Sequence, residues 1–358
     1  MRFGPRDVPA WLPWLALRSV AGLGTVLALS VIVFVATQAL PSDPARVVLG
    51  PDATEEAVRI LQRKLGLDLP LWEQYLRWQG AALHGDFGVS LDTQHPVNEL
   101  LRSRFANTLT LVLSVAAFGI PLALGLGIAL ATQRHSRFDR AFVGVLIAFK
   151  AVPVFAIGIG LVFVFSSAGL GLLPAVAVID PSCPLLSQLE YLVLPVVTLL
   201  FTSLPYPIRL VRSALIGVLE SDYIVAARLR GISEPRLLWR HALPNALLPA
   251  LQGGALMLSV MLGGALVVEV LFNVPGIGSA LDAAVGLRDL PVIQALVLVI
   301  AASVVAINLG ADLLAIFLTP RLRTRQIGVF GWRDRANRSS PAAHAALTQA
   351  GAAPGGSA

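Results

Sequence analysis

The sequence predicts an all-α polytopic membrane protein with six transmembrane helices. Hydrophobic residues make up 56% of its 358 residues and charged residues only 13%, roughly half the charged fraction of a soluble domain. Six windows are apolar over about 20 residues or more, the length with which a helix crosses about 30 Å of hydrocarbon. These windows are 17–39, 107–131, 141–167, 190–214, 245–271 and 291–318. Together they argue against a soluble enzyme.

The six windows are predicted to be helices and not strands of a membrane barrel. Leu, Val, Ile, Ala and Gly fill them, without the alternation of apolar and polar residues that barrel strands show. The first window carries Arg18 at its start, is too long for the core of a signal peptide and precedes no obvious cleavage site, so we expect an uncleaved anchor. A single cysteine, Cys183, excludes a disulfide framework and a paired-cysteine metal or redox site.

Positive charges orient the predicted helices. With a cytoplasmic N-terminus, eighteen Lys and Arg residues of the connecting segments fall inside and eight outside, seven of these in one long loop. Because short cytoplasmic loops carry the excess of positive charge, we expect both tails, 1–16 and 319–358, in the cytoplasm. Residues 336–358 have a composition that predicts disorder. The basic residues form no single patch of the kind that binds nucleic acid.

The external segment 40–106 is predicted to form a helical cap between the first and second spans. Asp52 and Glu55 have the spacing of a capping box, and Gly66 suits the end of the helix that follows. A second helix starts at Pro70, with aromatic residues that suit the membrane interface. The apolar residues at helical spacing are Ala57, Leu61 and Leu65 in the first helix, and Trp72, Tyr75, Leu76 and Leu83 in the second. Solvated helices that only pack on the bundle are an equally open interpretation.

Shorter external loops are expected at 168–189 and 272–290. The longer cytoplasmic segment, 215–244, is predicted to be a helix, a break and a second helix. Ser221 and Asp222 can cap the first helix. The small pair Ala226–Ala227 leaves room for close approach, and Gly231 suits the left-handed residue that ends the helix.

The second helix of this segment starts at Ser233 and Pro235, since proline is tolerated in a first turn. Pro244 is expected to end it before the fifth span begins. On spacing alone, an ordinary amphipathic loop is the alternative interpretation, because short motifs also match by chance.

The same segment carries a family resemblance. Val225-Ala226-Ala227, three residues, Gly231, nine residues and then His241-Ala242-Leu243-Pro244 is similar to the EAA loop, E-A-A-x3-G-x9-I-x-L-P, of the membrane subunits of ABC importers. Val225 replaces the Glu, which is commonly absent in one branch of the family, and His241 replaces the Ile. The resemblance implies that this loop couples the chain to ATPase subunits. The residues implied are Asp222, Tyr223, Ala226, Ala227, Gly231, His241, Leu243 and Pro244.

Motifs across residues 18–323 resemble that branch, which imports dipeptides, oligopeptides and nickel. They are Leu40-Pro41-Ser42-Asp43-Pro44-Ala45, Leu65-Gly66-Leu67-Asp68, Tyr75-Leu76-Arg77-Trp78, Gly85-Asp86-Phe87-Gly88-Val89-Ser90, His241 to Pro249, Gly263 to Glu269, and Pro275-Gly276-Ile277-Gly278. The resemblance implies the permease fold of type I ABC importers in a bacterial inner membrane. Of the two permeases in such an importer, it implies the first.

The resemblance also implies the partners. A second, homologous permease would form the other half of the pathway, with two cytoplasmic ATPase subunits and an extracytoplasmic solute-binding protein. The chain itself lacks a Walker A motif, because its only lysines, Lys64 and Lys150, follow Arg63 and Phe149. We therefore expect no catalysis, no metal site and no bound cofactor in this chain, with ATP and magnesium used by the partner subunits.

The expected solutes are di- or oligopeptides. Nickel chelates, glutathione and opine-like compounds are also compatible with the resemblance, because discrimination would lie largely in the binding protein.

Three charged residues inside the spans support a rival interpretation, a secondary transporter. Lys150, Glu269 and Asp312 are costly in a bilayer and would carry protons or ions at a midplane site. Alternatively, Glu269 lines the outer mouth of a solute pathway, bonds to a neighbouring helix or reaches the surface. Asp312 together with Asn308 near the inner end, and Lys150 with a carboxylate such as Asp312, would then make contacts between helices. The sequence shows no inverted repeat, and all five histidines lie outside the spans, which disfavours an intramembrane enzyme.

Glycines in the spans are predicted to permit close helix packing. They are Gly22, Gly24, Gly125, Gly127, Gly158, Gly160, Gly263 and Gly264.

Overall fold

A computed structural model of the chain describes residues 11–39, 44–50, 53–167, 170–180, 183 and 187–318. Residues 336–358, which the sequence predicts to be disordered, lie outside the described residues. Within the described ranges the backbone is mostly helical, and the β-structure consists of one isolated bridge between Val89 and Pro96.

Four helices are long and apolar enough to cross a membrane. They are α1 (Trp11–Gln38), α5 (Val97–Thr132), α12 (Leu243–Phe272) and α14 (Leu290–Leu318). These helices correspond to the first, second, fifth and sixth predicted windows, and two bent helix pairs bring the number of candidate spans to six if each pair is counted as one span. The structure therefore confirms an all-α polytopic architecture.

The third and fourth windows, expected as single spans, are each broken. α6 (Arg137–Ala151) and α7 (Val154–Val162), with the π-helical turn η1 (Phe163–Ser167), are bent by 101°. Val152 is extended at the break, because a residue that precedes proline is disfavoured in the helical conformation. α8 (Leu189–Ser203) and α9 (Pro205–Leu219) are bent by 44° at Pro205, whose ring clashes with the carbonyl four residues earlier.

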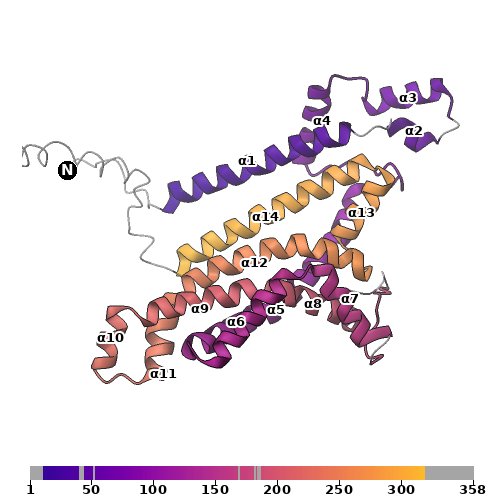
Figure 1. The fold of residues 1–358 in the computed structure, drawn as a ribbon. Helices are drawn as coiled ribbons and strands as arrows, with labels where there is room; N and C mark the ends of the chain where they lie inside the picture. The colour runs from indigo at the N-terminus through magenta and orange to yellow at the C-terminus, as the bar shows by residue number, and fades with distance from the viewer. Residues whose placement is uncertain are drawn as a thin grey trace, which may run out of the picture.

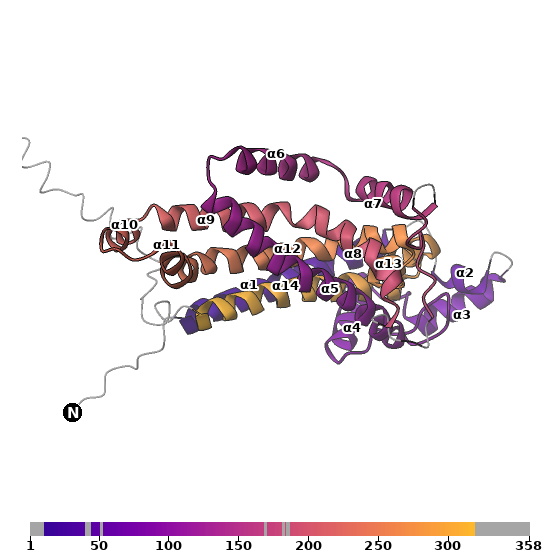
Figure 2. The ribbon, with the colours of Figure 1, turned by 90° about the horizontal axis from the view of Figure 1, so that it is seen from below.

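The helices pack around α12, which contacts α5, α8, α9 and α14. α1 lies along α14, and α6 lies on the outside of the bundle beside α9 (Figures 1 and 2). The largest buried cluster joins α5, α8 and α12, with Leu111, Leu199 and Met261 near its centre. A second cluster joins α1, α5 and α14 to a short helix, α13 (Ile277–Leu287).

The two ends of the bundle differ. α10 (Asp222–Leu229) and α11 (Glu234–Arg236) lie at one end, together with the start of α1 and the end of α14 (Figure 1). At the opposite end lie α2 (Pro44–Leu49), α3 (Glu55–Leu65) and α4 (Leu71–Leu83). The predicted cap and the predicted cytoplasmic segment are thus separated by the full length of the bundle.

The cap helices begin and end for local reasons. Thr54, not Asp52, caps α3, because its hydroxyl accepts a hydrogen bond from the Ala57 amide (3.3 Å) and Glu55 is already the first helical residue. Asp52 itself lies outside the described residues. Gly66 ends α3 in the left-handed region, as expected, with φ 68°.

The second cap helix, α4, is held against α1. Tyr75 and Trp78 lie against Phe34 of α1, with ring centroids 5.4 and 6.0 Å from it. The Tyr75 hydroxyl also lies 2.9 Å from that of Ser30. Trp72, Leu76 and Leu83 are exposed. The aromatic residues of α4 therefore divide between a contact with the bundle and an outer surface.

The span glycines fall into two groups. A Cβ atom on Gly127 would lie 2.6 Å from Val211 Cγ1 and 3.1 Å from the Ile208 carbonyl of α9, whereas one on Gly125 would meet nothing within 4 Å. Gly22 and Gly158 are similarly crowded, by Val305 and Leu271, while Gly24, Gly160 and Gly263 face open space. Close packing therefore requires only one glycine of each of the pairs at 22–24, 125–127 and 158–160.

Replacing Gly127 with Leu should destabilise the fold by about 1–3 kcal/mol, because the side chain would push α5 away from α9. Gly125→Leu is the matched control, two residues away on the same helix and exposed. Thermal unfolding of the purified protein in detergent, followed by tryptophan fluorescence, measures both. Equal midpoints for the two variants would contradict the α5–α9 packing.

Candidate functional site

The helical segment between α9 and α12 is the candidate site, and its first helix ends as predicted. Asp222 is the first residue of α10, where a carboxylate is favoured by the exposed backbone N–H groups. Gly231 has φ 80°. The Ile232 amide donates back to the Ala227 carbonyl (3.3 Å), which closes the helix end. Ser221 occupies the cap position, but its hydroxyl donates to the Val218 carbonyl and not toward α10.

The second helix does not end where the sequence predicted. Ser233 and Pro235 start α11, but the chain then continues through the π-helical turn η3 (Leu237–Ala242) into α12 without a break. The expected stop at Pro244 is wrong, because Pro244 directly follows the π-helical turn η3, and a local π-helical turn lets a proline sit within a continuous helical path. α11, η3 and α12 form one continuous helical path.

The inner face of the segment is buried against the bundle. Ile224 of α10 and Leu237 of η3 are fully buried, with Leu215 of α9 and Ala131 of α5. Ala242 and Ala246 complete this inner cluster, and Ala227 packs against it. A buried aliphatic side chain stabilises by about 1.5–3 kcal/mol. The inner cluster therefore joins the segment to the ends of α5, α9 and α12.

The outer face carries apolar side chains that nothing in the described chain covers. Leu229 is 85% exposed, and Tyr223, Val225 and Trp239 are also exposed. An apolar surface of this kind, outside the predicted spans, is typical of a site for another protein. Of the small pair predicted to allow close approach, Ala227 packs inward and Ala226 is only half-buried, so larger side chains form the outer face.

Two polar contacts fix the shape of the segment. Arg228 Nε donates to Glu234 Oε1 (2.5 Å), and this hydrogen bond holds the pKa of the Glu234 carboxyl below its usual range. The Tyr223 hydroxyl contacts the His241 carbonyl (3.4 Å) and accepts from Asn245 Nδ2 (2.8 Å). The structure thus brings Tyr223 and His241 together. Asn245 was missed as a site residue, although it follows the His-Ala-Leu-Pro run that signals this loop.

The remaining predicted residues of the segment lie at the start of α12. Leu243 is half-buried and Pro244 is exposed. In the sequence they lie between Ala242 and Ala246 of the inner cluster, at the point where the π-helical turn η3 passes into α12.

Glu269, the carboxylate near the opposite end of α12, is buried and fully occupied. Its Oε1 accepts from the Thr108 hydroxyl and its Oε2 from the Gly278 amide, both at 2.6 Å. Thr108 Oγ1 in turn accepts from the Ile277 amide (2.8 Å). Gly276 has no side chain to cap α13, so Glu269 and Thr108 satisfy the first amides of that helix. The buried carboxylate of Glu269 therefore has a structural role, because it accepts hydrogen bonds from donors at the start of α13 and from Thr108.

Of the other polar residues in the spans, Asp312 and Asn308 make the expected contacts between helices, whereas Lys150 does not pair with Asp312. Asp312 Oδ2 lies 3.4 Å from Arg18 Nε on α1, and Asn308 Nδ2 donates to the Ser259 hydroxyl of α12 (3.1 Å). The expected pair of Lys150 with Asp312 is wrong: α6 packs on α5, α8 and α9, away from α14. Lys150 is exposed and makes no ion pair within the described residues.

The described residues contain no cluster of three or more His, Cys, Asp or Glu side chains that could hold a metal ion. With up to six spans, a helical cap at one end and a packed helical segment at the other, the chain has the architecture of a multi-pass membrane permease.

Comparison with known proteins gives the family. Residues 123–324 match the family of binding-protein-dependent transport system inner membrane components, and residues 11–112 match the N-terminal part of the membrane components of such systems. The chain therefore belongs to this family. It is 36% identical over 299 residues to the glutathione transport system permease protein GsiC of Salmonella paratyphi A, which covers 84% of this chain and 95% of the relative. The Escherichia coli K12 protein of that name is 34% identical over the same shares. The chain is therefore an inner-membrane permease of an ABC importer of the peptide, oligopeptide and nickel type.

Replacing Glu269 with Ala should lower the free energy of unfolding by at least about 2 kcal/mol, because two buried donors lose their acceptor and each costs about 1–3 kcal/mol. Asp282→Ala, at an exposed carboxylate of α13, is the control and should change stability by less than about 0.5 kcal/mol. Denaturant or thermal unfolding in detergent measures both. An unchanged stability of Glu269→Ala, combined with lost solute movement, would point instead to an ion-carrying role.

Proposed function

We propose that this chain forms half of the translocation pathway of its importer, catalyses nothing itself, and is driven by cytoplasmic ATPase subunits that bind residues 221–244. The observation that carries the proposal is the two-faced helical segment. Its outer face exposes Leu229, Val225 and Trp239, while its inner face is buried against α5, α9 and α12. ATP and magnesium act in the partner subunits.

The inner cluster explains how force on the segment reaches the spans. Leu215, Ile224 and Leu237 come from α9, α10 and η3 and pack in one buried group. Packed interiors shift between arrangements as bodies and do not deform gradually. A displacement of the outer face by an ATPase therefore moves the adjoining ends of α5, α9 and α12 together.

The proposed topology places residues 221–244 and both termini in the cytoplasm and the cap outside. Support comes from the excess of Lys and Arg predicted on the cytoplasmic side. The arrangement of the bundle agrees, because α1 starts and α14 ends at the same end as α10 and α11, opposite α2–α4 (Figure 1). The proposed partners are a second, homologous permease, two ATPase subunits and an external solute-binding protein.

The proposed solutes are short peptides, glutathione among them. The branch resemblance favours di- and oligopeptides, and the two relatives above are named for the transport of glutathione, itself a tripeptide. A secondary transporter is not favoured, since Glu269 is occupied by hydrogen bonds, Asp312 pairs with Arg18 and Lys150 is exposed.

Leu229→Glu should reduce the ATPase subunits that co-purify with the tagged chain by tenfold or more, because about 1.4 kcal/mol of lost contact corresponds to tenfold. Leu83→Glu is the matched control: the two leucines are 85% and 77% exposed, at opposite ends of the bundle. Quantitative mass spectrometry of gently solubilised membranes measures the recovered subunits. Equal recovery of ATPase subunits with both variants would contradict the proposed docking of ATPases on α10. Purification of the wild-type chain without ATPases, combined with ATP-independent solute movement in liposomes, would contradict the proposed function.

The binding protein that docks on the reconstituted importer should bind glutathione and di- or tripeptides. Isothermal titration of that protein against glutathione, a dipeptide series and a nickel chelate tests the solute class. Binding of the nickel chelate alone would contradict the peptide proposal and leave the coupling role intact.

A further inference from the structure

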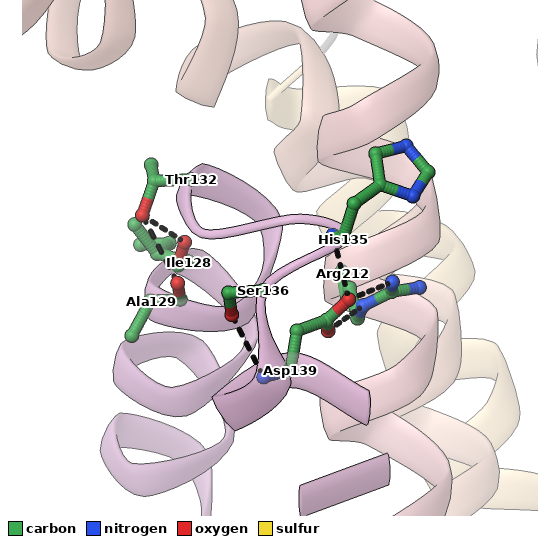
Figure 3. A network of polar contacts seen from close by, with 7 residues as sticks. All are labelled: Ile128, Ala129, Thr132, His135, Ser136, Asp139 and Arg212. Carbon is green, nitrogen blue, oxygen red and sulfur yellow. Dashed lines mark hydrogen bonds and ion pairs between the residues drawn. The ribbon is translucent and has the colours of Figure 1, made fainter. Parts of the chain in front are cut away.

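The turn between α5 and α6 is tied to α9 by a buried, two-pronged ion pair. Arg212 Nε donates to Asp139 Oδ1 and Arg212 Nη2 to Asp139 Oδ2, both at 2.7 Å. Asp139 Oδ2 also accepts from the His135 amide (3.2 Å), and the Asp139 amide donates to Ser136 Oγ (3.0 Å). Figure 3 shows these contacts converging on Asp139. The Asp139 side chain is only 3% exposed.

A second ion pair joins the same turn to the end of α9. Arg134 pairs with Glu220, the residue that caps α9. Glu220 is followed by Ser221 and then by α10. The turn is therefore fixed to α9 at two points, eight residues apart, and the second point adjoins the segment proposed to bind ATPases.

α6 also makes apolar contacts with the bundle. It lies on the outside (Figure 2), where Leu146 is buried in one cluster with Leu204 and Ile208, and the ring centroid of Phe149 lies 4.9 Å from that of Phe201. At its far end the chain bends by 101° at Val152 and Pro153 into α7. α7 is packed elsewhere, with Gly158 close to Leu271 of α12.

α6 is thus held at its start by an ion pair to α9 and connected at its end, through a sharp break, to a helix at the cap end of the bundle (Figure 1). An Arg fork on a buried carboxylate fixes orientation as well as distance. The other contacts of α6 are apolar and set no fixed direction, so this pair determines the orientation in which α6 follows α9.

We propose that Asp139 and Arg212 are positioning residues that make α6 follow the motion of α9, with the Val152–Pro153 break as the hinge. This inference rests on the proposed function of residues 221–244. It extends the moving body beyond the helices of the inner cluster to the broken third span.

The test compares Asp139→Asn with the exchanged pair Asp139→Arg, Arg212→Asp in the full importer with its ATPases and binding protein. Asp139→Asn should retain the ATPases and continue to hydrolyse ATP. The solute moved per ATP should fall at least about fivefold, the lower range of typical coupling between sites. The exchanged pair should recover at least half of the wild-type ratio. Arg77→Gln, which removes an exposed ion pair with Glu73 on the cap, should leave the ratio unchanged.

Arg212→Lys is the second variant, because it keeps the charge but loses the fork, and it should lower the same ratio without lowering the amount of assembled importer. A normal ratio in both Asp139→Asn and Arg212→Lys would overturn the inference. So would parallel losses of assembly, ATP hydrolysis and uptake that the exchanged pair does not reverse, since these indicate a purely structural pair. Failure of the wild-type chain to bind ATPases would instead overturn the proposed function, and this inference with it.

Discussion

Backbone polar groups within hydrocarbon have no water to bond with, and each interruption of a helix there must be compensated by the protein. The turn from α12 to α13 shows how this is done. Glu269 and Thr108 accept from the first amides of α13, and Asn107 donates to the Pro275 carbonyl (2.8 Å). A buried carboxylate that suggested ion transport is thus required by the shape of the backbone around it.

The same requirement explains where the other polar contacts lie. Gln294 Nε2 donates to Thr37 Oγ1 (2.8 Å) at the cap end of α1 and α14, and Arg18 pairs with Asp312 at the other end. Ser90 Oγ donates to Asp289 just before α14 begins (2.5 Å). Apart from the hydrogen bond between Asn308 and Ser259, the middle of the bundle is held mainly by apolar packing. Most of these polar side chains therefore fix the register of the helices near their ends.

Periodicity and composition were sufficient to locate the apolar helical segments, the helices of the cap, and the helical segment with its left-handed Gly231, but not the breaks at Pro153 and Pro205. They could not reveal partners across the bundle. No pattern in the sequence pairs Asp139 with Arg212, because a charged residue near the end of a span is equally compatible with a side chain that reaches the interface. The pairing of Lys150 with Asp312 failed for the same reason: hydropathy gives no helix adjacency. Gly127 differs from Gly125 only by the helix that faces it.

Because α11, η3 and α12 form one uninterrupted helical path, a tilt at α11 is transmitted along the whole of α12. α12 has 30 residues, so it is about 45 Å long. A tilt of only about 5° at the segment end therefore displaces the far end by about 4 Å. That far end carries Glu269 and, through it, α13. A small tilt at one end of the bundle therefore displaces Glu269 and α13 at the other end by several ångströms, without any helix having to unfold.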